Sequence, residues 1–277
     1  MCGDWHRALA PAAAIELVHN FSLIHDDIQD RSLLRRHRPT VWSRWGIAQG
    51  INAGDALLII AQQALFEIEP VLPPDVAPGA FRLLNRACQG LCEGQYLDLL
   101  WEDRPIVLVD QYLEMIGKKT ACLFSTAAEL GAYTSGATER VQHAWAGYGR
   151  ALGMAFQVVD DLLGVWGPEV DTGKTADLDV ATRKKTLPVV LSLGASPSPD
   201  ADRLRTLFAL DRLLTPEETT EATACLTHLG AREATAQVAR RYQSEALRWL
   251  DDLSAHADVT AVRTLTDTML PQLHADG

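Results

Sequence analysis

The spacing of apolar residues predicts helices along almost the whole chain. From Pro11 to Ile28, apolar side chains recur every three or four positions and so share one face of a helix. Pro11 suits the first turn of that helix, where its missing N–H costs no hydrogen bond. The same period predicts further helices at 54–68, 81–101, 109–131, 139–165, 187–193, 216–228 and 231–253. Strand-like alternation of apolar and polar residues extends over no comparable length.

Short breaks separate these helices. They lie at 31–46, 70–79, 167–183 and 195–202. The helix that starts at Pro216 has a capping box, with Thr215 before it and Glu218 at its third position. No break is a long low-complexity linker, and the sequence has no internal repeat. The pattern therefore predicts one all-α domain over residues 1–277, built as a single helical bundle.

Composition and charge narrow the class of protein. Of the 277 residues, 47% are hydrophobic and 22% are charged, which is typical of a globular protein with a sizeable core. The chain carries 25 Lys and Arg against 36 Asp and Glu, a net charge of −11, which argues against nucleic acid as a partner.

The sequence also bears on the cellular compartment. No apolar run reaches the roughly 18 to 20 residues of a membrane span, because polar side chains interrupt the best candidate, 53–68. The first residues do not form a convincing secretory signal. The five cysteines are odd in number and scattered, which favours reduced thiols. We therefore expect a cytoplasmic protein.

Two acidic clusters stand at the ends of apolar helices. The first contains Asp26, Asp27 and Asp30, and the second is the pair Asp160 and Asp161. Asp26 and Asp30 are four positions apart, so they project from one helix face. Carboxylates in apolar surroundings are costly unless a cation neutralises them. We expect the two clusters to face each other across the bundle.

Basic residues accompany both clusters. Arg35 and Arg36 follow the first; Lys118, Lys119, Lys174, Arg183, Lys184 and Lys185 lie between the clusters or after the second. Magnesium takes few protein carboxylates and completes its coordination with water and phosphate oxygens. One acidic run alone could be a solvated helix end, but two runs with basic companions predict a site for a diphosphate bridged by magnesium.

The order of these motifs resembles that of the trans-isoprenyl diphosphate synthases, or polyprenyl synthetases. ELVHNFSLIHDDIQD followed by LLRRHRPT is similar to the first aspartate-rich motif of the family and its paired arginines. NAGDALL, EGQYLDL and GKKTACLF follow, and FQVVDDLLGVWG with TGK and KKTLP resembles the second aspartate-rich region. The resemblance covers residues 4 to 195 and implies an all-α bundle around a deep apolar cavity.

The resemblance also implies a role for each residue. The magnesium ligands would be Asp26, Asp27, Asp30, Asp160 and Asp161, which would hold three ions together with diphosphate. The allylic diphosphate would be bound by Arg35, Lys119, Lys174 and Lys184, and the diphosphate of isopentenyl diphosphate by Arg36. Thr120 and Gln157 would line the reacting centre, where their oxygens stabilise positive charge.

The reaction so implied has three steps. An allylic diphosphate ionises, the double bond of isopentenyl diphosphate attacks, and a proton is lost. Metal ions and basic side chains would stabilise the departing diphosphate, while apolar walls would keep water from the cation. The family resemblance further implies a homodimer.

Phe21 and Ser22 bear on product length. They precede Asp26 by five and four positions, which places them about 6 to 7.5 Å deeper along the same helix. A single aromatic side chain at the lower level, with no insertion in DDxxD, resembles the arrangement of synthases that make C20 products. We therefore favour geranylgeranyl diphosphate over farnesyl diphosphate. If Phe21 is only a core residue, it carries no information on length.

Two features depart from the family pattern. Gly164 stands where many relatives carry a third aspartate, and we expect activity to survive because Asp160 and Asp161 remain. No Gly-Gly-Lys-x-Arg element precedes Asp26, although relatives use one to bind isopentenyl diphosphate. The chain is therefore either shortened or lacks half of one substrate site.

Two alternatives to chain elongation stay open. A class I terpene cyclase, or a transferase with another acceptor, needs only the allylic diphosphate, but the retained lysines and paired arginines argue against it. A non-catalytic subunit of a larger synthase would have no need of buried carboxylates.

Overall fold

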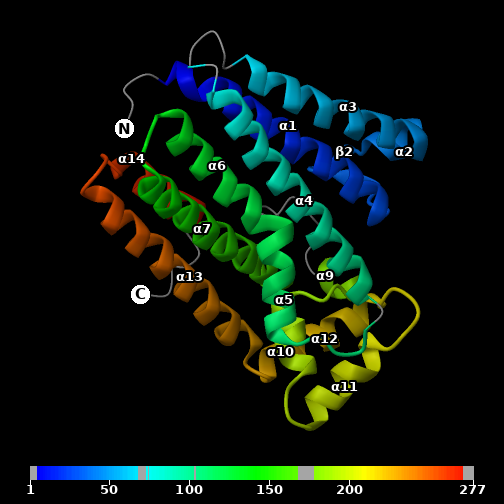
Figure 1. The fold of residues 1–277 in the computed structure, drawn as a ribbon. Helices are drawn as coiled ribbons and strands as arrows, with labels where there is room; N and C mark the ends of the chain where they lie inside the picture. Colours follow the sequence, from blue (N-terminus) through cyan, green and yellow to red (C-terminus); the bar gives the residue numbers. More distant parts are fainter. Residues whose placement is uncertain (1–4, 68–72, 74, 103, 168–177, 271–277) are drawn as a thin grey trace.

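Helices dominate the computed structural model, which describes residues 5–67, 73, 75–102, 104–167 and 178–270 (Figure 1). In chain order the elements are α1 (His6–Gln29), β1 (Leu34–Arg35), β2 (Arg38–Pro39), α2 (Val41–Trp45), α3 (Ile47–Phe66), α4 (Val76–Glu102), α5 (Val109–Ile116), the π-helical turn η1 (Gly117–Ala121), α6 (Cys122–Thr134), α7 (Glu139–Trp166), α9 (Leu178–Ala181), α10 (Leu187–Leu193), α11 (Pro199–Phe208), α12 (Pro216–His228), α13 (Ala231–Ser254) and α14 (Thr260–Met269). The predicted all-α class is therefore confirmed.

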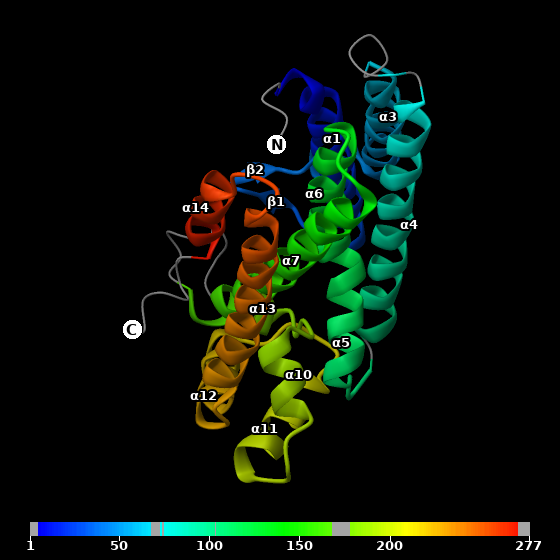
Figure 2. The ribbon, with the colours of Figure 1, turned by 60° about the vertical axis from the view of Figure 1, so that its left-hand side comes forward.

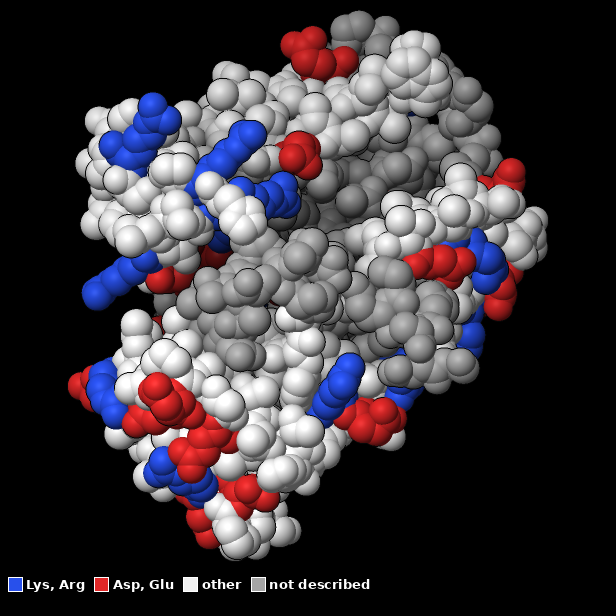
Figure 3. All heavy atoms as spheres, turned by 180° about the vertical axis from the view of Figure 1, so that it is seen from behind, with Lys and Arg blue, Asp and Glu red and all other residues white. Residues whose placement is uncertain are grey.

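The long helices pack side by side in a bundle (Figure 1). α7 contacts both α6 and α13, α1 packs against α3, and α4 packs against α6 and η1. The short helices α10, α11 and α12 gather at the end of the molecule remote from the N-terminus (Figures 1 and 2). Lys and Arg side chains lie next to Asp and Glu side chains on the face seen in Figure 3. No described helix combines the length and the apolar character that crossing a membrane requires.

The apolar side chains form three clusters that follow this arrangement. The largest fills the space between α5, α7 and α13 and includes Leu152 and Leu250. The second joins α1, α3, α4 and α6 through residues such as Phe21 and Leu84. The third lies among α7, α9, α10, α11 and α12. The first two clusters line the helices that carry the predicted site residues.

Several helix boundaries differ from those predicted. The helix predicted to start at residue 81 begins at Val76, because Pro78 falls in its first turn, where proline is tolerated. The break at 195–202 contains the start of α11, which Ser198 caps by accepting a hydrogen bond from Ala201 N at 3.2 Å. The break at 31–46 contains a hairpin and α2. The segment 109–131 is helical, but η1 interrupts its α-helical period.

The capping box predicted at α12 is present. Glu218 N donates to Thr215 Oγ1 at 3.3 Å, and Thr215 N donates to a Glu218 carboxylate oxygen at 2.9 Å. Arg212 also donates to both Glu218 oxygens at 2.7 Å. These hydrogen bonds, with Arg212 the main cause, lower the pKa of Glu218 from 4.5 to about 2.

The lowered pKa predicts a pH-dependent contribution to stability. Because the folded-state pKa lies below the unfolded one, the carboxylate stabilises the fold above about pH 4.5, and the contribution is lost as the pH falls toward 2. Glu218→Gln keeps a side-chain acceptor for Thr215 N but removes the charge. We expect its melting temperature to be below that of the wild type at pH 7, with the difference shrinking below pH 4.5. A difference that stays constant between pH 7 and pH 3 would contradict this assignment.

Candidate active site

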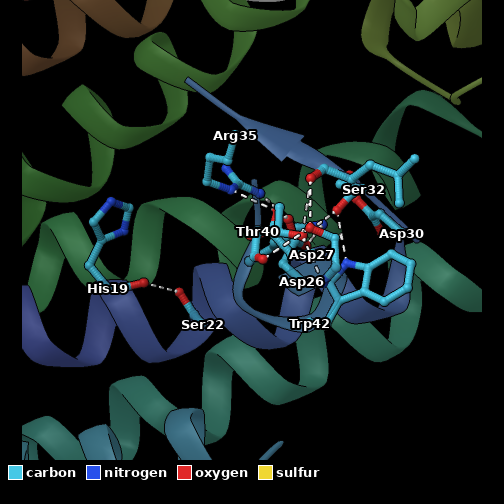
Figure 4. Close-up of polar contacts among 12 residues, drawn as sticks. His19, Ser22, Asp26, Asp27, Asp30, Ser32, Arg35, Thr40 and Trp42 are labelled. Atoms are coloured by element: carbon cyan, nitrogen blue, oxygen red, sulfur yellow. Dashed lines mark hydrogen bonds and ion pairs between the residues drawn. The ribbon is translucent and has the colours of Figure 1, made fainter. Parts of the chain in front are cut away.

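A short hairpin follows α1 and carries the first arginine of the site. Ser32 N donates to Asp27 O at 2.9 Å, and Ser32 O in turn accepts hydrogen bonds from Thr40 Oγ1 and Trp42 Nε1, both at 2.8 Å (Figure 4). These bonds fix the hairpin against the end of α1. Arg35, on β1, is thereby held close to the aspartates.

The hairpin turns through two residues in the left-handed region. Arg36 and His37 have φ values of 49° and 62°, as a two-residue turn of type I′ requires. Neither is a glycine, and each such residue costs roughly 1 to 2 kcal/mol. The turn places Arg36 at the exposed tip and leaves Arg35 directed inward.

The first acidic cluster lies at the end of α1, where Asp27 is buried, Asp26 is half-buried and Asp30 is exposed. Arg35 donates from Nε to Asp27 Oδ1 at 2.8 Å and from a terminal nitrogen to Asp26 Oδ2 at 3.3 Å. Burial raises the pKa of Asp27, against the hydrogen bond and charge of Arg35. Burial also disfavours the charged form of Asp26, but Lys119, Lys184 and Arg35 outweigh it and hold the pKa of Asp26 below its usual value.

Two lysines complete this cage of charges. Lys119 Nζ lies 3.1 Å from Asp26 Oδ1 and 2.5 Å from Asp98 Oδ2. Lys184 Nζ lies 3.9 Å from Asp30 Oδ2. Burial disfavours the charge of each lysine, but nearby carboxylates, with Asp98 the first among them, raise both pKa values. Both lysines are therefore cationic at the end of α1.

Asp98 is a site residue that sequence reasoning missed. It belongs to the motif EGQYLDL, where it is an acid among apolar residues of α4. That setting is the same signal that marked the two aspartate clusters. In the structure its carboxylate holds Lys119, so α4 contributes to the site as directly as α1 does.

The π-helical turn η1 presents Lys119 and Thr120. It packs against α4 at Gly94, where a Cβ atom would lie only 2.6 Å from Lys119 Cα. Only a residue without a side chain permits this close approach. Lys118 points elsewhere, because its Nζ lies 3.2 Å from carboxylate oxygens of both Glu93 and Glu114 at the surface.

The second acidic cluster divides between the surface and the interior. Asp160 is exposed, whereas Asp161 is only 2% exposed. Asp161 Oδ2 accepts hydrogen bonds from Tyr112 and from Leu187 N, the latter at 2.9 Å, and Oδ1 accepts one from Gln157 Nε2 at 3.1 Å. Burial raises the pKa of Asp161 to about 7 in spite of these bonds.

The two clusters are linked by residues that sequence analysis also selected. Thr120 Oγ1 donates to Gln157 Oε1 at 2.7 Å, which joins η1 to the second cluster. Lys184, beside Asp30, lies three residues before Leu187, whose N–H binds Asp161. Lys174 lies outside the described residues.

Gly164 leaves room for a carboxylate from another element. A Cβ at this position would lie 3.2 Å from Asp179 Cγ. The carboxylate of Asp179, on α9, therefore occupies the space that the Cβ of an aspartate at position 164 would need.

This fold is the all-α fold of the isoprenyl diphosphate synthases. The structure matches the crystal structure of a polyprenyl synthetase from Streptomyces coelicolor with a TM-score of 0.86 and 39% sequence identity, over 96% of this chain and 78% of that one. The family model of the polyprenyl synthetases matches residues 2–226, and the chain belongs to that family.

Relatives with names that describe an activity include a farnesyl and a geranylgeranyl diphosphate synthase. The chain is 47% identical over 186 residues to a (2E,6E)-farnesyl diphosphate synthase of Mycobacterium tuberculosis, which is 67% of this chain and 51% of that relative. It is 40% identical over 263 residues to a geranylgeranyl diphosphate synthase of the same species, which is 95% of this chain and 74% of that relative. The chain thus spans about half the length of the first and three quarters of the second.

Proposed function

We propose that this protein is a magnesium-dependent prenyltransferase that condenses isopentenyl diphosphate with an allylic diphosphate. The observation that carries the proposal is the cage of Asp26, Asp30, Arg35, Lys119 and Lys184 at the end of α1. A cluster of acidic and basic side chains at one point can bind a diphosphate together with its magnesium ions. The activities named for the relatives support the same reaction.

The residues of the cage fit magnesium. Within the described part of the chain, Asp26 Oδ1 is buried and accepts no hydrogen bond, although Lys119 Nζ is 3.1 Å away. No three described acidic, His or Cys side chains converge into a ready metal site. Magnesium typically takes one or two carboxylates and completes its octahedron with water and substrate phosphates. In this proposal Asp26, Asp27, Asp30 and Asp160 would hold magnesium ions, three in number, together with the diphosphate, and the bound metal would supply positive charge to the departing group.

In this proposal the basic residues bind the two diphosphates, and Thr120 with Gln157 stabilises the allylic cation. Arg35, Lys119 and Lys184 bind the allylic diphosphate, and Lys174 belongs to the same set. Arg36, at the tip of the hairpin, binds the diphosphate of isopentenyl diphosphate. Thr120 and Gln157 turn oxygen dipoles toward the allylic carbon, where positive charge develops on ionisation.

The direct test is an assay with magnesium, labelled isopentenyl diphosphate and C5, C10 or C15 allylic diphosphates in turn. Labelled diphosphates longer than the primer would support elongation. An unlabelled hydrocarbon would point to cyclisation instead. The absence of any turnover, both by this chain and by a version extended upstream, would contradict the proposal.

Phe21 supports a product of C20. It is 6% exposed and belongs to an apolar cluster with residues of α3, α4 and α6, about one and a half helical turns before Asp26 on α1. Ser22, one level higher, is small and donates its hydroxyl to His19 O at 2.8 Å. We propose that Phe21 is the floor of the chain-length cavity and that the product is geranylgeranyl diphosphate, with farnesyl diphosphate the alternative.

Phe21→Ala is expected to lengthen the product. Removal of the ring opens space beneath the cavity, so C25 and longer diphosphates should form beside C20. The measurement is the chain-length distribution of labelled products by chromatography. Phe81→Ala is the matched control, because it removes a partly buried Phe of the same cluster that packs against Phe66, with ring centroids 6.1 Å apart. An unchanged distribution in Phe21→Ala would refute the floor.

We further propose that the protein is a homodimer that works in the cytoplasm. α3 lies at the edge of the molecule and exposes Ile51, Ile59 and Ile60 by 44%, 52% and 47% (Figures 1 and 2). Exposed apolar side chains on one helix support a second copy as the partner. Free thiols at Cys88, Cys92, Cys122 and Cys225 support a reducing compartment. Light scattering after gel filtration tests the dimer, and a monomer mass would contradict it.

A further inference from the structure

A chain of hydrogen bonds connects the buried interior to the reacting centre. Tyr112 on α5 and Leu187 N at the start of α10 both donate to Asp161 Oδ2. Asp161 Oδ1 accepts from Gln157 Nε2 at 3.1 Å, and Gln157 Oε1 accepts from Thr120 Oγ1 at 2.7 Å. Tyr112 is 3% exposed and Asp161 is 2% exposed, so neither side chain is placed to exchange these partners for water.

We infer that Asp161 and Tyr112 are positioning residues that fix the orientation of the Gln157 amide, and that Asp161 is not a metal ligand. Both oxygens of Asp161 already accept hydrogen bonds from the chain itself. The inference rests on the proposed function, because it gives Gln157 its role beside the allylic carbon.

The direction of the amide follows from hydrogen-bond chemistry. A Thr hydroxyl both donates and accepts, so Thr120 alone leaves Gln157 free to turn either end toward the reacting centre. In the structure Asp161 accepts on both carboxylate oxygens, and its Oδ1 receives the hydrogen bond from Gln157 Nε2 at 3.1 Å. Asp161 therefore draws the NH₂ group of Gln157 toward itself, and the oxygen must face Thr120 and the site where positive charge develops.

Tyr112 and Leu187 N hold the carboxylate itself. Both donors bind Oδ2 of Asp161, so Oδ1 remains to accept the hydrogen bond from Gln157. The Leu187 N–H is fixed by the backbone of α10, and the burial of the Tyr112 ring fixes the position of its hydroxyl oxygen. The second acid of the DD pair thus acts through Gln157, whereas its neighbour Asp160 lies exposed.

Asp161→Asn should reverse this dipole. The Asn oxygen would take the place of Oδ2, since Tyr112 and Leu187 N are both donors, and its NH₂ would face Gln157. Gln157 would then turn its oxygen toward residue 161 and its NH₂ toward the cation. We expect kcat to fall at least about tenfold, with the KM of each diphosphate within about twofold of the wild type, since ground-state binding rests on other residues.

Tyr112→Phe keeps the ring and removes one donor. Loss of one hydrogen bond loosens Asp161 without reversing the amide, so we expect kcat to fall about five- to tenfold. Tyr148→Phe is the matched control, because Tyr148 is also buried and its hydroxyl lies 2.9 Å from Thr266 Oγ1, a residue of α14 that the proposed site does not use. We expect its kcat to equal that of the wild type.

The deciding test is whether these losses depend on Gln157. In a Gln157→Met background, Asp161→Asn and Tyr112→Phe should cause no further fall in kcat, because the amide that they orient is gone. If Asp161→Asn or Tyr112→Phe lowered kcat in the Gln157→Met background by the same factor as in the wild type, the inference would be overturned and the proposed function would stand. A wild type without turnover would overturn the proposed function and the inference with it. Melting temperatures of all variants identify any loss that comes from unfolding.

Discussion

Asp26→Ala is expected to reduce turnover of an allylic diphosphate by about a thousandfold while the helical fold stays intact. Asp26 is the carboxylate on which most of the site converges, because Arg35, Lys119 and Lys184 all contribute to its lowered pKa. Its Oδ1 is also buried and accepts no hydrogen bond from the described residues. Without it, magnesium loses a ligand at the end of α1, and the departing diphosphate loses that stabilisation.

The fold should survive because the neighbouring charges keep other partners. Lys119 retains Asp98 at 2.5 Å, and Arg35 retains Asp27 at 2.8 Å. Steady-state kinetics at saturating magnesium measures the loss, and calorimetric titration with magnesium and inorganic diphosphate measures binding separately. Asp252→Ala, which removes an exposed aspartate of α13, is the matched control and should leave both unchanged. Wild-type turnover by Asp26→Ala would refute the proposed metal site.

Much of the site could be predicted from the sequence because its residues belong to helices with a clear period. The four-residue spacing of Asp26 and Asp30 placed both on the helix end where Lys119 and Lys184 meet them. Thr120 and Gln157 were selected for the same centre, and the structure joins them at 2.7 Å. A helical period fixes which residues share a face, and the structure has Asp26 and Asp30 on the face of α1 that meets the two lysines.

The parts that could not be predicted depend on contacts between elements. Asp160 and Asp161 look alike in sequence, but one helical step separates an exposed carboxylate from one buried against α5 and α10. The break at 31–46 gave no sign of its hairpin, because Arg36 and His37 are not typical residues for a left-handed turn. The position of the π-helical turn depends on the absence of a side chain at Gly94, which lies on another helix. The spacing of apolar residues in 109–131 therefore does not predict the turn.

Gly94→Ala is expected to lower kcat/KM by about 10- to 100-fold through that contact. The new Cβ would lie 2.6 Å from Lys119 Cα and 2.8 Å from the carbonyl carbon of Lys118, both backbone atoms that cannot rotate away. Helix α4 and η1 must then separate by about 1 Å to reach ordinary van der Waals contact. A displacement of that size is enough to misalign reacting groups.

Asp98 shows why this separation reaches the chemistry. It lies four residues after Gly94 on the same face of α4, so the shift that relieves the Cβ also pulls its carboxylate from Lys119. Overpacking should in addition lower the stability by about 1 to 3 kcal/mol, which thermal melting measures. Gly131→Ala is the control, because a Cβ there meets nothing within 4 Å and the helix gains up to about 1 kcal/mol. A loss of kcat/KM in Gly94→Ala but not in Gly131→Ala would show that the packing of η1 against α4 positions Lys119 and Thr120. Wild-type kcat/KM in both variants would contradict this.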